Sequence, residues 1–301
     1  MRITRRSLFK SAAVIAAAPT GLMAESSVLP TRKIPSSGAA IPVVGIGTNR
    51  YGVGDDVEKL LPLRETLAKY AELGGGLIDT APSYRNSETV LGRLIAELEL
   101  GDQFFMATKC DEKGGNATRA QVASSEQKLQ SGTLDLVAIH NLRSWQEQLS
   151  VLRELQQDQK INHIGITTSR HSQFEALADI LKNEPLDFVQ LNYSIADRMA
   201  EEQLLKLASD KGVAVMINLP FGHGRLFKAV KGKTLPKWTA EHGISSWAQY
   251  FLKFVISHPA VTCVIPGTTK VRHLVDNLGA SYGPMPDAKQ RQVMLSAFES
   301  L

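Results

Sequence analysis

Four side chains that could donate, accept or hold a proton stand at or just after the ends of short apolar runs: Asp79, Tyr84, Lys109 and His140. A free phenol has a pKa of about 10, so a tyrosine is a poor proton donor or acceptor at neutral pH. A neighbouring ammonium, from Lys109, would lower the pKa of Tyr84, and Asp79 would keep that ammonium charged in a dry site. Singly, each residue has an ordinary structural explanation. Together they indicate acid–base chemistry at one place.

The apolar runs that precede these residues predict the strands that carry them. Most runs are four to six residues long, and several are nearly unbroken, as is typical of a parallel sheet with both faces buried. The predicted strands are residues 43–47, 77–80, 104–109, 134–140, 163–167, 188–192, 213–218 and 262–266. Because the carboxyl ends of parallel strands meet at one edge, three successive strand ends would place Asp79, Lys109 and His140 side by side.

Amphipathic helical patterns alternate with the strands, at residues 57–73, 88–98, 118–129, 146–157, 173–181, 201–211, 245–257 and 271–278. Eight strand–helix units in succession predict an α/β fold, a (β/α)8 TIM barrel. We also expect an N-terminal β-hairpin over residues 34–44 and a C-terminal extra helix over 287–301. A doubly wound sheet is the alternative, but no Gly-x-Gly-x-x-Gly follows an early strand.

The residues around the four side chains resemble the aldo-keto reductase family. The resemblance rests on Ile78-Asp79-Thr80-Ala81-x-x-Tyr84-x-Asn86-x-Glu88, Thr108-Lys109, Ile139-His140 and Ile265-Pro266-Gly267-Thr268, and it extends from about residue 34 to residue 278. It implies a barrel domain over residues 34–301 that reduces a small aldehyde or ketone to an alcohol with NADPH. In that reaction hydride passes from the nicotinamide to the carbonyl carbon, His140 orients the carbonyl oxygen, and Tyr84 delivers the proton.

The same resemblance implies where the cofactor binds. It assigns cofactor contacts to Gly47, Thr48, Asp79, Thr167, Thr168, Gln190, Asn218, Pro220, Gly267, Thr268, Thr269, Lys270, His273 and Asn277. A strand ending in Pro-Gly-Thr-Thr before a helix would leave N–H groups free for phosphate oxygens, with Lys270 and Arg272 nearby. Thr167-Thr168, Asn218 and His273 stand where the family often has Ser-Asn, an aromatic residue and arginine. These departures leave NADH as an alternative to NADPH.

The first 24 residues are typical of an export signal. Thr4-Arg5-Arg6-Ser7-Leu8-Phe9-Lys10 resembles the twin-arginine (Tat) motif, an alanine-rich run follows, and Leu22-Met23-Ala24 is an acceptable cleavage site. A polar linker is expected over residues 25–33. Since the Tat machinery exports folded proteins, the sequence predicts a bacterial periplasmic protein that could be loaded with cofactor before export.

Charge and composition exclude several classes of partner and site. The net charge of +4 comes from Arg2, Arg5, Arg6 and Lys10 in the leader, so the remaining chain has a formal charge of 4 − 4 = 0 and no basic surface that would indicate nucleic acid. No segment is long and apolar enough for an ordinary membrane span. No His/Cys cluster has metal-ligand spacing, and Cys110 and Cys263 are predicted to be core thiols.

Two other functions remain open on the sequence alone. A cofactor-binding module that senses redox state or docks on a partner would use the same barrel, and an aldolase or isomerase would use Lys109 as a Schiff-base amine. The pocket walls are less well defined by the sequence. Residues 221–243 are predicted to be a long loop over the site, and Tyr51, Trp145 and Phe221 are candidate wall residues.

Overall fold

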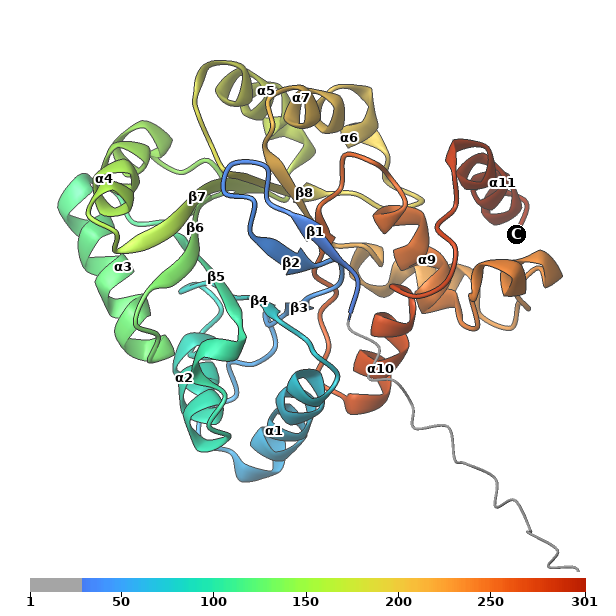
Figure 1. Ribbon diagram of the computed structural model, residues 1–301, viewed down its shortest axis with the longest axis horizontal. Coiled ribbons are helices and arrows are strands. Elements are labelled where there is room, and N and C mark those ends of the chain that lie inside the picture. The colour runs from blue at the N-terminus through green and yellow to red at the C-terminus, as the bar shows by residue number, and fades with distance from the viewer. Residues whose placement is uncertain (1–28) are drawn as a thin grey trace, which may run out of the picture.

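The computed structural model describes residues 29–301, and a closed parallel barrel lies at its centre (Figure 1). Eight strands hydrogen-bond in chain order: β3 (Ile46–Gly47), β4 (Leu77–Asp79), β5 (Phe105–Cys110), β6 (Leu134–His140), β7 (Ile161–Thr168), β8 (Phe188–Asn192), β9 (Ala214–Asn218) and β10 (Cys263–Val264). Parallel bridges from Val44 to Val264 and from Gly47 to Gly267 join the first strand to the last. The predicted barrel is therefore confirmed.

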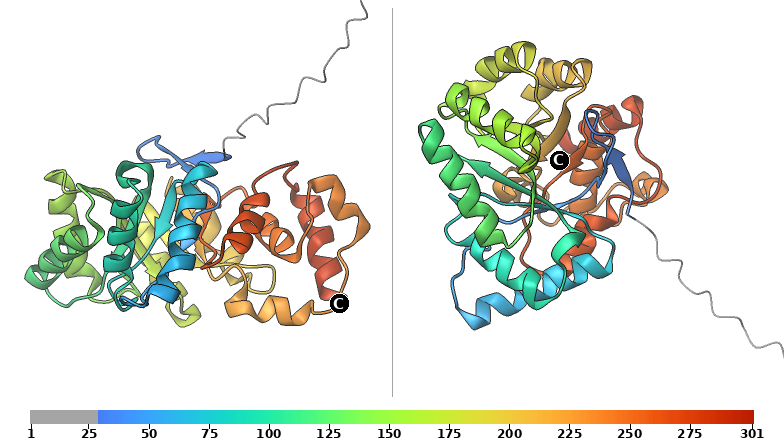
Figure 2. Two further views of the ribbon diagram at one scale, coloured as in Figure 1. Left: turned by 90° about the horizontal axis from the view of Figure 1, so that it is seen from below. Right: turned by 60° about the vertical axis from the view of Figure 1, so that its left-hand side comes forward.

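Helices surround the barrel, as Figures 1 and 2 show from three directions. They are α1 (Val57–Glu72), α2 (Ser87–Glu97), α3 (Gly115–Leu129), α4 (Trp145–Gln157), α5 (Phe174–Asn183), α6 (Met199–Glu202), α7 (Leu204–Asp210), α8 (Arg225–Ala229), α9 (Trp247–Ile256), α10 (Val271–Gly279) and α11 (Ala288–Glu299). Short 3-10 turns are η1 (Gly101–Gln103), η2 (His171–Gln173), η3 (Gly222–Gly224) and η4 (Lys237–His242). No helix of residues 29–301 has the length and apolar character that crossing a membrane requires.

Side-chain alternation along the strands explains both the core and the site. The barrel interior is filled by one set of alternate strand residues, which includes Leu77, Ala107, Leu136, Phe188, Ala214 and Met216. Side chains repeat every second residue on one face of a strand. Two residues beyond Leu77 is Asp79, and two beyond Ala107 is Lys109, so both continue the inward-facing set at the carboxyl end of the barrel.

The N-terminal hairpin covers the other end of the barrel (Figure 2). Its strands β1 (Thr31–Lys33) and β2 (Ala40–Pro42) pair antiparallel, and Ile34 and Ile41 join the apolar cluster of the barrel interior. The prediction of a hairpin is confirmed, but its bounds over 34–44 were wrong. β1 lies within residues 25–33, which were predicted to be linker, and Leu29 is already buried. A three-residue strand of Thr, Arg and Lys carries no apolar pattern that would have revealed it.

Three further boundaries differ from the sequence prediction. The single helix predicted over residues 201–211 is replaced by the two short helices α6 and α7, which meet at Gln203, whose φ of −144° is not helical. Residues 221–243, predicted to be a loop, contain η3, α8 and η4. The predicted strands 43–47 and 262–266 shrink to two hydrogen-bonded residues each, where the barrel closes. Cys110 and Cys263 are buried free thiols, as predicted.

Candidate active site

A buried ion pair lies at the carboxyl end of the barrel, between β4 and β5. Lys109 Nζ donates to both carboxylate oxygens of Asp79, each at 2.8 Å, and to the carbonyl oxygen of Thr80 at 2.7 Å. The two residues are 2% and 4% exposed. Burial lowers the pKa of Lys109, but the Asp79 carboxylate and Tyr84 raise it, and the net pKa lies above the usual value. The ammonium is therefore a fixed positive charge.

Tyr84 stands beside this ammonium on the loop that follows β4. Lys109 Nζ lies 5.1 Å from the centroid of the Tyr84 ring. The Lys109 charge is the largest single influence on the phenol and lowers its pKa, whereas burial and the Asp79 carboxylate raise it. The net pKa of Tyr84 lies above its ordinary value. The sequence predicted a net lowering, and this was wrong because it left out burial and the second charge of the pair.

The loop that holds Tyr84 is fixed from two sides. The Tyr84 amide donates to the carbonyl oxygen of Ala81 at 3.0 Å, and the Ser87 amide donates to the carbonyl oxygen of Tyr84 at 3.1 Å. Gly52, in the loop after β3, packs so closely that a Cβ there would lie 2.5 Å from the Tyr84 carbonyl oxygen. Glycine is thus required at position 52 for the two loops to meet.

His140, at the end of β6, completes the group of four. Its ring makes an edge-on contact with Tyr84 at a centroid distance of 6.3 Å, and its Nδ1 lies 3.3 Å from Ser83 Oγ. Burial and the charge of Lys109 lower the pKa of His140 to about 4. At neutral pH the imidazole is therefore uncharged and carries a single N–H. The structure thus brings together all four residues that the sequence proposed as catalytic.

Gln190, on β8, connects the ion pair to the opposite wall. Its Nε2 donates to Asp79 Oδ1 at 2.8 Å and lies 3.1 Å from Met216 Sδ, and its Oε1 accepts from Thr167 Oγ1 at 2.9 Å. A carboxylate inside a barrel needs several donors to offset its lost hydration. The Lys109 ammonium and the Gln190 amide supply them.

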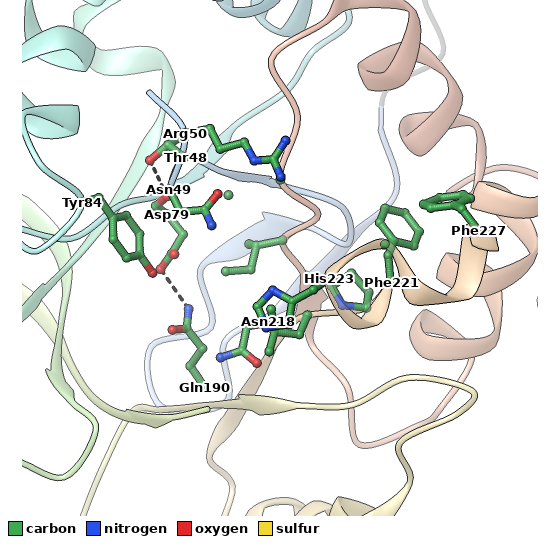
Figure 3. Close-up of a pocket in the computed structure, with 16 residues that line it drawn as sticks. Thr48, Asn49, Arg50, Asp79, Tyr84, Gln190, Asn218, Phe221, His223 and Phe227 are labelled. Carbon is green, nitrogen blue, oxygen red and sulfur yellow. Dashed lines mark hydrogen bonds between the residues drawn. The ribbon is translucent and has the colours of Figure 1, made fainter. Parts of the chain in front are cut away.

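A cavity of about 330 Å³ opens over Tyr84 and Asp79. Figure 3 shows Tyr84, Asp79 and Gln190 on one side of it, with His223, Phe221 and Phe227 on the other. Its lining is Gly47, Thr48, Asn49, Arg50, Asp79, Tyr84, Gln190, Asn218, Leu219, Pro220, Phe221, His223, Gly224, Phe227, Ile265 and Gly267. Among the described residues, no group of three His, Cys, Asp or Glu side chains could hold a metal ion.

Comparison with known proteins identifies the family. The profile of the Aldo/keto reductase family matches residues 43–293. The chain belongs to the aldo/keto reductase family. This confirms the resemblance seen in the sequence, and it makes the protein an oxidoreductase of that family.

Relatives and solved structures agree with this assignment. The NADH-specific methylglyoxal reductase of Escherichia coli K12 is 28% identical over 243 residues, covering 68% of this chain and 72% of that protein. Pyridoxine 4-dehydrogenase of the same organism is 29% identical over 240 residues, covering 72% and 79%. An aldo/keto reductase from Klebsiella pneumoniae, solved with NADP and acetate, superposes with a TM-score of 0.72 at 24% identity, covering 90% and 96%.

The cofactor residues proposed for this aldo/keto reductase fall into two sets. Gly47, Thr48, Asp79, Gln190, Asn218, Pro220 and Gly267 line the cavity, whereas Thr167, Thr168, Thr268, Thr269, Lys270, His273 and Asn277 do not. The Thr167 hydroxyl donates to Gln190, and that of Thr168 donates to Gln173 at 2.5 Å. Lys270 N already donates to Thr268 Oγ1 at 3.3 Å, so the predicted row of free N–H groups is interrupted there. The cofactor roles of these residues stay predictions.

Two features near the cavity concern its backbone and its unpaired acceptors. A Cβ at Gly47 would lie 2.8 Å from the carbonyl oxygen of Ile265, so the two closing strands approach as only glycine allows. The buried side-chain oxygens of Asn192 and Asn218, paired across β8 and β9, have no hydrogen-bond partner among the described residues. Of these two oxygens, that of Asn218 belongs to a residue that lines the cavity, where it could accept a hydrogen bond from a polar ligand such as a nicotinamide amide.

Sequence reasoning missed several wall residues of the cavity. Asn49 and Arg50 directly follow Gly47-Thr48, and their position in the loop after a barrel strand could have indicated them. His223 and Phe227 lie in the segment after β9 that was expected to cover the site. Of the predicted apolar walls only Phe221 lines the cavity, because Tyr51 is wholly buried in the core and Trp145 packs partly against it.

Proposed function

We propose that this protein reduces a small aldehyde or ketone to the alcohol with NADPH, with Tyr84 as the proton donor. The observation that carries the proposal is the placement of Tyr84 beside the buried Asp79–Lys109 pair at a cavity wall. When bound, the nicotinamide supplies the hydride that reduces the carbonyl carbon. The protein supplies position, electrostatics and a proton.

The raised pKa of Tyr84 keeps the phenol protonated at neutral pH but makes it a weaker acid. It can still protonate the substrate oxygen, because the alkoxide that forms on hydride transfer is a much stronger base than a phenolate. Once the proton leaves, the phenolate is next to the Lys109 ammonium, which stabilises it at the moment charge develops. Lys109 itself is not the nucleophile of a Schiff base, because its pKa is raised and its protons are held by Asp79 and Thr80.

NADPH is the cofactor that we propose, with NADH as the alternative. Structures of similar fold hold NADP or NADPH, whereas one curated relative is described as NADH-specific. Lys270 and Arg272 at the start of α10 could bind an adenosine 2′-phosphate, and Arg272 Nε lies 3.3 Å from His273 Nε2. Fluorescence titration with NADPH and NADH, for the wild type and Arg272→Ala, separates the two: only NADPH binding should weaken in the variant.

The Tyr84→Phe variant tests the reaction. It should bind NADPH as the wild type does and lose about 10²- to 10⁴-fold in kcat on a panel of small aldehydes, since a general acid contributes about that factor. Turnover that is undiminished in Tyr84→Phe would overturn the assignment of the proton donor. A protein that retains nucleotide but reduces no carbonyl compound would instead favour the cofactor-binding module.

We also propose that the chain is exported to the bacterial periplasm by the Tat machinery. The support is the sequence of residues 1–24, which lie outside the described part of the structure. Replacing Arg5 and Arg6 together with lysine should leave the protein in the cytoplasm, as shown by cell fractionation. N-terminal sequencing of the periplasmic protein tests cleavage after Ala24. A periplasmic double-lysine variant would overturn the proposal.

A further inference from the structure

His140 has one proton to place and two ring nitrogens on which to place it. Because its pKa is about 4, the imidazole is neutral in the working range, and a neutral imidazole donates from one nitrogen and accepts at the other. The proposed function, on which this inference rests, needs the N–H to face the substrate carbonyl oxygen. Something in the protein must therefore select the tautomer.

The surroundings of Nδ1 distinguish the two tautomers. Ser83 Oγ lies 3.3 Å from His140 Nδ1, within hydrogen-bond distance, whereas Asp111 Oδ2 lies 3.8 Å away, beyond it. A serine hydroxyl can donate to a bare nitrogen or accept from an N–H, whereas a carboxylate can only accept, so contact with Ser83 rather than Asp111 permits the Nε2–H tautomer. In the described part of the chain no group hydrogen-bonds His140 Nε2, and the side chain is 16% exposed, although His140 does not line the cavity over Tyr84.

Asp111 is held away from the imidazole by other donors. Gln121 Nε2 donates to Asp111 Oδ1 at 2.8 Å, and Arg143 donates to Asp111 Oδ2 at 3.4 Å. Gln121 Oε1 in turn accepts from the backbone amide of Asp111 at 2.9 Å. Were the carboxylate to accept from Nδ1–H instead, the only proton of His140 would face away from the substrate.

We infer that Ser83 is a positioning residue that selects the Nε2–H tautomer of His140 by donating its hydroxyl hydrogen to Nδ1. Nε2–H is then the donor that holds the carbonyl oxygen. Ser83 immediately precedes Tyr84, so one loop carries the proton donor and fixes the hydrogen-bond donor that orients the acceptor. Ser83 does not line the cavity over Tyr84 and acts through His140.

Nitrogen-15 NMR of the wild-type protein decides the tautomer without any substrate. The His140 resonances are assigned by their absence from a His140→Gln spectrum, and we expect a pyridine-type Nδ1 and a pyrrole-type Nε2. In Ser83→Ala the two shifts should move towards each other as the Nδ1–H form becomes populated, and Ser83→Thr should restore the wild-type pattern. A pyrrole-type Nδ1 in the wild type, or unchanged shifts in Ser83→Ala, overturns the inference.

Kinetics then connect the tautomer to the reaction. Ser83→Ala should lower kcat about five- to tenfold, as expected for one lost hydrogen bond, with the Kd for NADPH unchanged. Ser83→Thr should recover the rate. Ser124→Ala is the matched control, because Ser124 lines the same groove as Ser83 without contacting His140. An equal rate loss in Ser124→Ala and Ser83→Ala overturns the inference. A wild type with the Nε2–H form but no carbonyl reduction overturns the proposed function alone.

Discussion

Two lysines of this barrel are almost entirely enclosed, and they are treated in opposite ways. Lys109, 2% exposed, faces the Asp79 carboxylate, whereas Lys253 on α9, 0% exposed, donates among the described residues only to the carbonyl oxygens of His242 and Tyr282. Burial penalises both ammonium groups. The pKa of Lys109 nevertheless lies above its usual value, while burial lowers that of Lys253 to about 8. A full opposing charge offsets desolvation, and carbonyl dipoles do so only in part.

The two environments suit two tasks. The Asp79–Lys109 pair keeps a positive charge in place whatever Tyr84 does, as a proton donor requires of its neighbour. Lys253 instead ties the end of η4, at His242, to the turn after α10, at Tyr282, and so connects the segment that covers the cavity to the barrel. A lysine can therefore be as buried as a catalytic one and serve structure alone.

Removing each ammonium in turn should produce the largest difference between the two lysines. Lys109→Met should lower kcat about 10²- to 10⁴-fold and destabilise the fold by about 3–5 kcal/mol, because it leaves the Asp79 carboxylate unpaired. Lys253→Met should keep near wild-type activity, since it lies outside the site. Steady-state kinetics and urea unfolding of both variants provide the measurement. An equal loss of activity in the two variants would contradict the assignment of Lys109 to catalysis and Lys253 to structure alone.

A double variant measures how strongly the two site charges depend on each other. Asp79→Asn alone leaves the Lys109 ammonium without its counter-charge and should cost about 2–4 kcal/mol in the free energy of unfolding. Asp79→Asn combined with Lys109→Met should cost clearly less than the sum of the single changes, because no charge is left unpaired. Additive costs would mean that Gln190 and Thr80, rather than the ion pair, stabilise this part of the barrel. Reductase activity should be lost in both single variants and in the double variant.

The stability contributions of Lys253 and Lys109 should change with pH in opposite directions. Lys253 has a folded pKa of about 8 against an ordinary 10.5, so the unfolded chain binds more protons between these values, and the stability of wild type relative to Lys253→Met should rise by about 1–3 kcal/mol there. Lys109 has a raised folded pKa. The stability of the wild type relative to Lys109→Met should therefore stay constant up to pH 10.5 and fall above it. Urea titrations from pH 7 to 11 check both slopes.

The comparison also shows what a sequence can and cannot supply. Asp79, Lys109 and His140 could be assigned to one edge because each ends an apolar run, and strand alternation then fixes the inward direction. Tyr84 could be assigned to the same site because it stands only five positions after Asp79 in the sequence. By contrast, the net pKa of Tyr84 depends on two charges and burial acting together. The cavity walls His223 and Phe227 depend on how residues 221–243 fold, and nothing in the pattern around Lys253 distinguishes its carbonyl partners from a carboxylate.

The smallest expected effect tests how rigidly the carbonyl oxygens around Lys253, those of His242 and Tyr282, are held. Gly283 has a φ of +77°, and an added Cβ would lie 3.1 Å from the His242 carbonyl oxygen and 3.5 Å from Lys253 Nζ. Gly38 has a similar φ of +74° and nothing within 4 Å. Both glycine-to-alanine changes carry the same left-handed backbone strain of about 1 kcal/mol. Any extra cost of Gly283→Ala, which we expect to be about 0.5–1 kcal/mol by urea unfolding, reports how firmly that carbonyl is held. Equal losses in the free energy of unfolding for Gly283→Ala and Gly38→Ala would mean that the His242 carbonyl moves aside easily, and that Lys253 is only loosely held.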